Sequence, residues 1–95
     1  MNIETIKQKA VPILRKYGIK KASVFGSFAR YEQTKNSDID ILIEYSPGVE
    51  KSLLKRIELK NELQKALNKD VDVMTEQAIS PLIRENVLKE KREIF

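Results

Sequence analysis

Apolar residues recur along this chain with two different periods, and the changes between them predict its secondary structure. Helical spacing relates Ile3, Ile6, Ala10 and Leu14, whereas residues 38–45 are rich in β-branched side chains, as strands are. The pattern predicts helices over 3–17, 50–67 and 80–89, and strands over 21–26, 38–45 and 70–75. Residues 93–95 form either a short edge strand or a frayed end. This order predicts one domain over 1–95 with an α/β fold, a two-layer α+β arrangement in which helices cover one face of a small mixed sheet.

Residues that interrupt, end or cap these elements are also visible in the sequence. Pro12 lacks a backbone donor inside the first predicted helix, so we expect a kink there or two short helices. Gly18 follows that helix as a stop signal, and residues 28–36 form a polar connection. Ser80 and Pro81 suit the N-cap and the first position of the last helix.

The composition removes several classes of chemistry. The 95 residues include neither cysteine nor histidine, which excludes disulfides, thiolate metal sites and catalytic triads built on histidine. Catalysis would therefore depend on carboxylates, hydroxyls, lysine or arginine, and a hard metal ion. The net charge of +4 suits phosphate ligands, nucleic acid or an acidic partner, and equally an ordinary solvated surface.

Other patterns bear on location and partners. There is no tight Lys/Arg block with interleaved aromatic residues, so the sequence does not favour nucleic-acid binding. We find no long apolar segment and no signal-peptide pattern, and therefore expect a soluble, cytoplasmic protein that makes no use of a membrane. Whether the chain forms a homo-oligomer stays open.

Two aspartates and a glycine–serine turn form the most informative pattern. Asp38 and Asp40 flank Ile39 at the start of a predicted strand, so both carboxylates point to one face while Ile39 points into the core. Crowded carboxylates repel each other, and a divalent cation relieves the repulsion. The turn at Gly26 and Ser27 would bring backbone N–H groups and a hydroxyl close to this cation, where a triphosphate could lie. The layout is typical of metal-dependent phosphoryl or nucleotidyl transfer.

A third carboxylate is expected, because chemistry with two metal ions usually needs one to share an ion. Asp70 and Asp72 in the third predicted strand are the candidates. Asp70 stands at the strand entrance, where it suits a solvated turn. Asp72 lies between Val71 and Val73, where aspartate fits poorly unless something binds it, so we favour Asp72. The alternative is an exposed sheet face on which Asp72 simply meets water.

Together these residues resemble the minimal nucleotidyltransferase (MNT) branch of the DNA polymerase beta superfamily. The ordered match extends over nearly the whole chain. It consists of Gly26-Ser27, Ala29-Arg30, Ser37-Asp38-Ile39-Asp40 and Val71-Asp72-Val73. The resemblance implies the nucleotidyltransferase fold, two Mg²⁺ ions, and transfer of AMP from ATP to a hydroxyl.

The resemblance also implies roles for individual residues. Asp38, Asp40 and Asp72 match the aspartates that hold the ions and carry out the chemistry, with Asp72 activating the acceptor hydroxyl. Gly26 and Ser27 match the turn that holds the β- and γ-phosphates. Two further residues of the motif, Arg30 and Ser37, belong to the nucleotide-binding set.

Two positions in this set need comment. Arg30 contacts either phosphate or a neighbouring carboxylate, and the sequence does not separate these roles. Tyr31 stands where small members of the branch commonly have glycine, which adopts backbone conformations that tyrosine resists.

The resemblance further implies a partner, because the short chain leaves little surface for holding an acceptor. In this branch the usual partner is a HEPN-domain toxin, which the MNT protein neutralises as an antitoxin by covering it or by adding AMP to a tyrosine. The main alternative is a non-catalytic antitoxin that acts by binding alone. Two weaker alternatives are a nucleotidyltransferase that modifies small molecules such as aminoglycosides, and a basic nucleic-acid-binding module.

Overall fold

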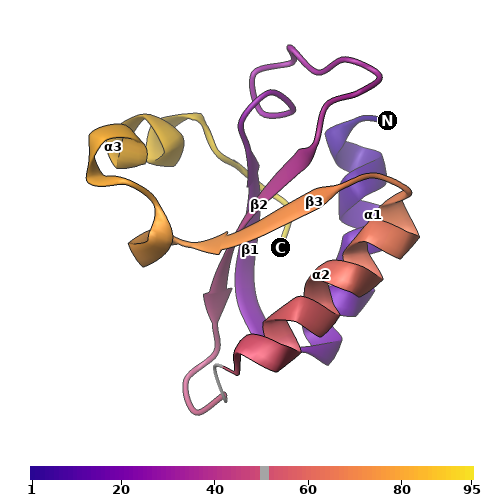
Figure 1. Cartoon of the computed structure of the whole chain (residues 1–95), viewed down its shortest axis with the longest axis vertical. Coiled ribbons are helices and arrows are strands. Elements are labelled where there is room, and N and C mark those ends of the chain that lie inside the picture. The colour runs from indigo at the N-terminus through magenta and orange to yellow at the C-terminus, as the bar shows by residue number, and fades with distance from the viewer. Residues whose placement is uncertain (50–51) are drawn as a thin grey trace.

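The predicted order of helices and strands is confirmed in the computed structural model, which describes residues 1–49 and 52–95 (Figure 1). The helices are α1 (Ile3–Lys16), α2 (Leu53–Leu67) and α3 (Pro81–Glu90), and a short 3-10 turn, η1 (Glu76–Ala78), precedes α3. The strands are β1 (Ile19–Phe25), β2 (Ile39–Tyr45), β3 (Val71–Thr75) and β4 (Arg92–Glu93). Part of the predicted helix over 50–67 falls on residues 50–51, which lie outside the described residues.

The strands form one mixed sheet in the order β3-β2-β1-β4. β1 runs antiparallel to both β2 and β4, whereas β2 and β3 are parallel and are connected through α2. A parallel pair needs such a crossover, because the chain must return to the same end of the sheet. Of the two alternatives for residues 93–95, the edge strand is the one formed, but as β4 it begins one residue earlier and ends at Glu93, where it pairs with β1.

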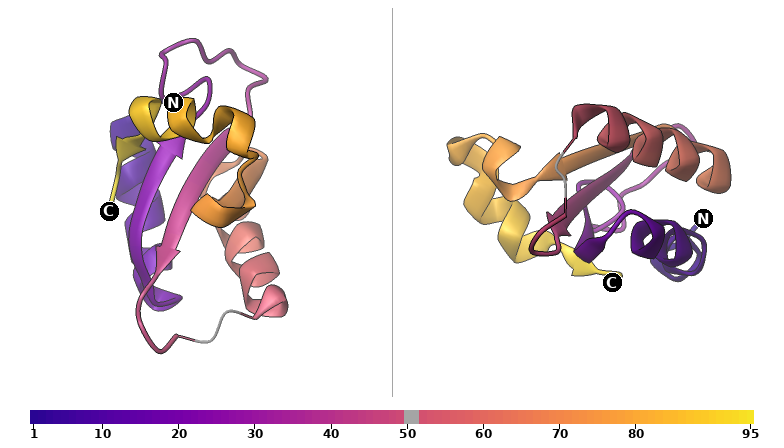
Figure 2. Two further views of the ribbon diagram at one scale, coloured as in Figure 1. Left: turned by 90° about the vertical axis from the view of Figure 1, so that its left-hand side faces the viewer. Right: turned by 90° about the horizontal axis from the view of Figure 1, so that it is seen from below.

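The main core lies between one face of the sheet and the helices α1 and α2 (Figure 2). Helical spacing places Ile6, Ala10 and Leu14 of α1 on this core, and α2 contributes Leu59 and Leu63. The sheet contributes alternate residues, since side chains of a strand point to opposite faces. These residues include Val24, Ile39, Ile41, Ile43, Val71 and Val73.

The opposite face of the sheet is partly covered by α3, which lies across from α1 and α2 (Figure 2). Leu42 of β2 packs there against Ile79 and Val87, with Phe25 and Leu88 at the margin of the cluster. The α+β fold class with a small mixed sheet is confirmed, but the helices do not all lie on one face as expected, because this smaller cluster places α3 on the opposite face.

Of the two alternatives expected at Pro12, two short helices is wrong: α1 is a single helix that continues through Pro12. Pro12 is exposed, so the backbone donor that proline lacks is missing on the solvent side. The buried stripe of the helix holds both halves against the sheet, and Asn2 caps its first turn by accepting from the Thr5 N–H at 2.9 Å. Within residues 1–49 and 52–95, no helix is long and apolar enough to cross a membrane.

Candidate active site

Asp40 and Asp72 lie side by side on neighbouring strands. The parallel pairing of β2 with β3 places Asp40 opposite Asp72, and the antiparallel pairing with β1 places it opposite Phe25. Asp38 precedes β2 by one residue, two positions before Asp40. Because Ile39 is buried in the main core, alternation directs Asp40 and Asp72 to the other face of the sheet.

The three carboxylates influence one another electrostatically. Partial burial raises the pKa of Asp40 above its usual value, and the negative charges of Asp72 and Asp38 raise it further. The positive charge of Arg30 opposes this shift as a smaller effect. Asp72 is more open, with a side chain that is 58% exposed and an Nζ–Oδ1 distance of 4.0 Å from Lys60. Asp40 is therefore the carboxylate whose charged form is most disfavoured by its surroundings, and a bound cation would relieve this effect.

Gly26 lies against Asp40 at the end of β1. Its φ of +72° is in the left-handed region, which glycine adopts without a steric penalty. A Cβ at this position would collide with Oδ2 of Asp40. Only glycine allows the chain to turn this close to the carboxylate, so the structure brings the predicted turn and the predicted aspartate together.

The turn continues through residues 27–32 as one compact helical turn. The carbonyl of Gly26 accepts hydrogen bonds from the N–H groups of Ala29 (3.1 Å) and Arg30 (3.2 Å). Phe28 and Ala29 are buried, with Phe28 in the main core, and they anchor the turn to the sheet. The exposed loop that follows therefore leaves from a fixed base.

Arg30 and Ser37 make contacts within the protein. Arg30 donates to Glu32 and Glu90, with N–O distances of 3.2 Å in both cases, so it takes the carboxylate-pairing role that the sequence left as one of two alternatives. The hydroxyl of Ser37 accepts from the Thr34 N–H at 2.8 Å and closes the loop before Asp38. A nucleotide-binding role for either residue stays a prediction.

These features can be compared with known proteins. The sequence model of the family described as "Nucleotidyltransferase domain" matches residues 7–94. The chain belongs to this nucleotidyltransferase family. The family and the enzyme class expected from the sequence are thereby confirmed.

Relatives of this nucleotidyltransferase agree with the assignment. It is 51% identical, over the full length of both chains, to a candidate protein adenylyltransferase of Methanocaldococcus jannaschii. A solved candidate minimal nucleotidyltransferase matches with a TM-score of 0.78 and 33% identity, over 97% of this chain and 95% of the other. A solved toxin–antitoxin with AMP-PNP matches with a TM-score of 0.77 and 26% identity, over 94% of this chain and 72% of the other.

The carboxylates of this nucleotidyltransferase suit a hard divalent cation by their chemistry, since Mg²⁺ prefers oxygen ligands. In the described part of the chain, no group of three or more acidic side chains is gathered closely enough to hold an ion as it stands. Asp72 instead lies 4.0 Å from Lys60. The residues fit the cation through donor type, and Asp40 and Asp72 also through their shared face, but binding would require the carboxylates to come closer together.

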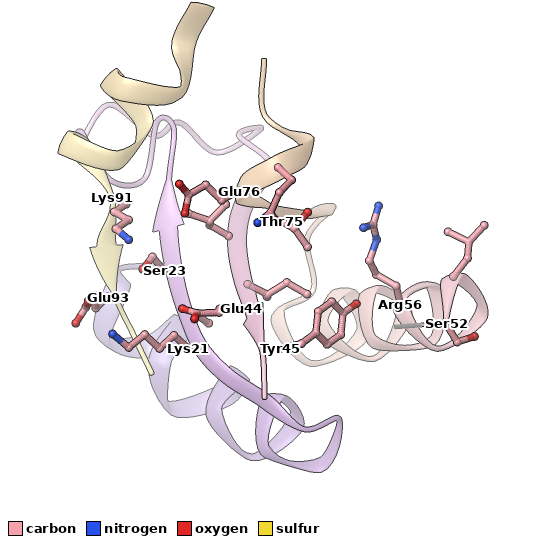
Figure 3. Close-up of a pocket in the computed structure, with 15 residues that line it drawn as sticks. Lys21, Ser23, Glu44, Tyr45, Ser52, Arg56, Thr75, Glu76, Lys91 and Glu93 are labelled. Carbon is pink, nitrogen blue, oxygen red and sulfur yellow. The ribbon is translucent and has the colours of Figure 1, made fainter. Parts of the chain in front are cut away.

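A groove of about 790 Å³ is lined by Ser23 of β1 and Glu44 of β2, among others (Figure 3). Because Leu42 and Glu44 alternate with the core residues of β2 as Asp40 does, the groove lies on the same sheet face as Asp40. Its charged lining mixes both signs. The basic residues are Lys21, Arg56 and Lys91, and the acidic residues are Glu44, Glu76 and Glu93.

Sequence reasoning missed three residues that contact the site. Lys60 of α2 faces Asp72, Glu90 of α3 pairs with Arg30, and Arg92 of β4 donates to the Ala29 carbonyl at 2.8 Å. Glu90 and Arg92 come from elements remote in sequence from the residues they meet, whereas Lys60 lies in the helix directly before β3. Their positions follow from tertiary packing, and no motif in the sequence marks them.

Proposed function

We propose that this nucleotidyltransferase transfers AMP from ATP to a hydroxyl of a partner protein, in a reaction that depends on Mg²⁺. The observation that carries the proposal is the placement of Asp40. It lies opposite Asp72 in the parallel strand pair and against the turn at Gly26, with a pKa raised by partial burial and, to a smaller extent, by the charges of Asp72 and Asp38. A half-buried carboxylate that faces other carboxylates and a tight glycine turn is a costly arrangement unless a cation and a nucleotide use it.

Each residue has a role in this proposal. Asp38 and Asp40 would hold two Mg²⁺ ions, and Asp72 would complete one ion site and orient the acceptor hydroxyl. When bound, the ions would supply charge neutralisation and a lower pKa for the attacking hydroxyl. The backbone at Gly26 and Ser27 would hold the triphosphate in line, with pyrophosphate as the leaving group. Catalysis of this kind rests on positioning and electrostatics, and needs no histidine.

The proposed partner is a HEPN-domain toxin, with a tyrosine as the acceptor. Two findings support this direction: the similarity to a candidate protein adenylyltransferase and the similarity to a toxin–antitoxin solved with AMP-PNP. In this proposal the chain acts as the antitoxin, and adenylylation of the toxin is the means of neutralisation.

Label transfer tests the proposal. Purified protein is incubated with Mg²⁺ and α-³²P-labelled ATP in lysate of the source organism, beside the variants Asp40→Asn and Asp70→Asn. Asp70 is exposed and lies just before β3, so its variant removes a nearby charge while leaving the three proposed ligands in place. We expect a labelled protein with the wild type and with Asp70→Asn, and at least about a hundredfold less label with Asp40→Asn.

Two outcomes would contradict the proposal. Undiminished labelling by Asp40→Asn would show that the aspartates are not the catalytic site. If the wild type binds ATP and Mg²⁺ but labels nothing in a lysate that contains its partner, a non-catalytic antitoxin becomes the better assignment.

A further inference from the structure

Tyr31 adopts a backbone conformation that usually requires glycine. Its φ is +58°, in the left-handed region, although its side chain carries a Cβ and a ring. Around it, the N–H of Glu32 donates to the Ser27 carbonyl at 2.9 Å, and the N–H of Tyr31 donates to the Phe28 carbonyl at 3.4 Å. This pair of bonds is the Schellman pattern that closes a helical turn, in which the left-handed position is commonly glycine.

Arg92 contacts the same turn at two points. Its guanidinium carbon lies 4.4 Å from the centroid of the Tyr31 ring, within the range of a cation–π interaction. Its Nε donates to the Ala29 carbonyl at 2.8 Å. The backbone of Arg92 is itself fixed, because it pairs with Val24 in the antiparallel contact between β4 and β1.

We propose that Arg92 is a positioning residue for the nucleotide-binding turn. By stacking on the Tyr31 ring and donating a hydrogen bond to the Ala29 carbonyl, Arg92 keeps the backbone of Tyr31 in the left-handed conformation, which a tyrosine would otherwise leave. That conformation lets the N–H of Glu32 reach the Ser27 carbonyl, and so fixes the backbone of Ser27, which directly follows the Gly26 that lies against Asp40. The proposal rests on the proposed function, since Ser27 is the residue expected to hold the triphosphate.

The chain offers a way to separate positioning from general stability. A glycine at position 31 adopts positive φ without strain, so a turn that contains it has less need of the arginine. The Tyr31→Gly substitution should therefore restore ATP binding to a protein that lacks Arg92. A purely structural arginine would give no such rescue, because the substitution adds no contact to β4.

The experiment measures the Kd for ATP with Mg²⁺ by titration calorimetry in Arg92→Ala, Tyr31→Gly and the double variant. Lys89→Ala is the matched control, because it removes the same charge from a neighbouring position whose ion pair is with Glu85, outside the turn. We expect Arg92→Ala to weaken ATP binding by about fivefold, and the other three proteins to stay within about twofold of the wild type. In label transfer, the loss should appear in KM for ATP and leave kcat largely unchanged.

The outcomes distinguish this proposal from the proposed function. If the wild type binds no ATP, the proposed function fails. If the wild type binds ATP and Arg92→Ala binds equally well, or if the double variant stays as weak as Arg92→Ala, the role of Arg92 is refuted. Should Arg92→Ala fail to fold, Arg92→Gln keeps a donor for Ala29 without the cation, and the same rescue by Tyr31→Gly is required of it.

Discussion

At the scale of single residues, Gly26 and Gly48 form a matched pair. Both have positive φ, at +72° and +81°, but a Cβ on Gly26 would collide with Asp40, whereas among residues 1–49 and 52–95 one on Gly48 would meet nothing within 4 Å. Gly48→Ala should cost about 1 kcal/mol through backbone strain alone. Gly26→Ala should cost about 1–3 kcal/mol more, because Asp40 or the turn must move.

Urea unfolding of the two variants measures these costs, and ATP titration gives the effect on the site. Gly26→Ala should lose ATP binding while Gly48→Ala retains it. Equal unfolding free energies for the two variants would mean that the contact between Gly26 and Asp40 does not constrain the turn.

Asp40 makes stability depend on pH with a defined sign. Its pKa is raised in the folded protein from an ordinary value of 3.8, so the folded state holds this proton more tightly than the unfolded state. Stability contributed by this group therefore falls as pH rises from 3.8 through the folded pKa, and the loss persists at neutral pH. Asp40→Asn removes the titration, and should be more stable than the wild type at neutral pH by at most about 1 kcal/mol, since solvent screens a half-buried group.

Unfolding in urea with chelator present, at a series of pH values, checks this sign. The advantage of Asp40→Asn should shrink as pH falls toward 3.8 and below, where Asp40 is protonated in both states. A variant that is less stable than the wild type at neutral pH would show that the Asp40 carboxylate is stabilising without a cation.

The placement of side chains at this site was predictable where local rules decide it. The alternation of Asp38, Ile39 and Asp40 gives the face of the sheet, and the pairing of Asp40 with Asp72 agrees with it. The left-handed φ of Tyr31 was beyond reach, because it is held by a contact with Arg92 from the far end of the chain.

At the scale of elements, α2 offers two leucines with opposite surroundings. Leu63 is fully buried in the main core, whereas Leu54 is 66% exposed. Leu63→Ala should therefore lower the free energy of unfolding by about 2–5 kcal/mol, and Leu54→Ala by at most about 0.5 kcal/mol. Chemical denaturation measures both. Similar losses would mean that α2 does not cover the sheet through the face described.

The type of each helix or strand was predictable from the period of its apolar residues, but the packing of these elements against one another was only partly predictable. The bounds of β2 and α3 differ from the prediction by a residue or so, because β-branched runs and the Ser80 cap are local signals. The placement of α3 over Leu42 depends on a long-range contact, and the continuity of α1 through Pro12 on packing of its buried stripe. The stripe of α1 is visible in the sequence as helical spacing, but the surface against which it packs is not, and the contact of α3 with Leu42 leaves no periodic trace.

At the scale of the whole molecule, ligand binding should raise the melting temperature. ATP with Mg²⁺ that binds only the folded protein adds about 2.7 kcal/mol when free ATP is about 100 times its Kd. Differential scanning fluorimetry with ATP, with Mg²⁺, and with both should show the full shift only for the combination. Asp40→Asn is the control. An equal shift in that variant would place ATP elsewhere on the molecule.

The parallel pairing of β2 with β3 has a consequence for folding kinetics. Asp40 and Asp72 meet only after α2 has crossed over the sheet, and such long-range pairing is slow because a large loop must close first. If the pairing forms after the transition state, ATP with Mg²⁺ would leave the refolding rate unchanged and slow unfolding alone. Where cleavage by a protease is faster than refolding, the half-life of the ligand-bound protein would then exceed that of the free protein. The ratio of the two half-lives would equal the factor by which the ligand lowers the unfolding rate.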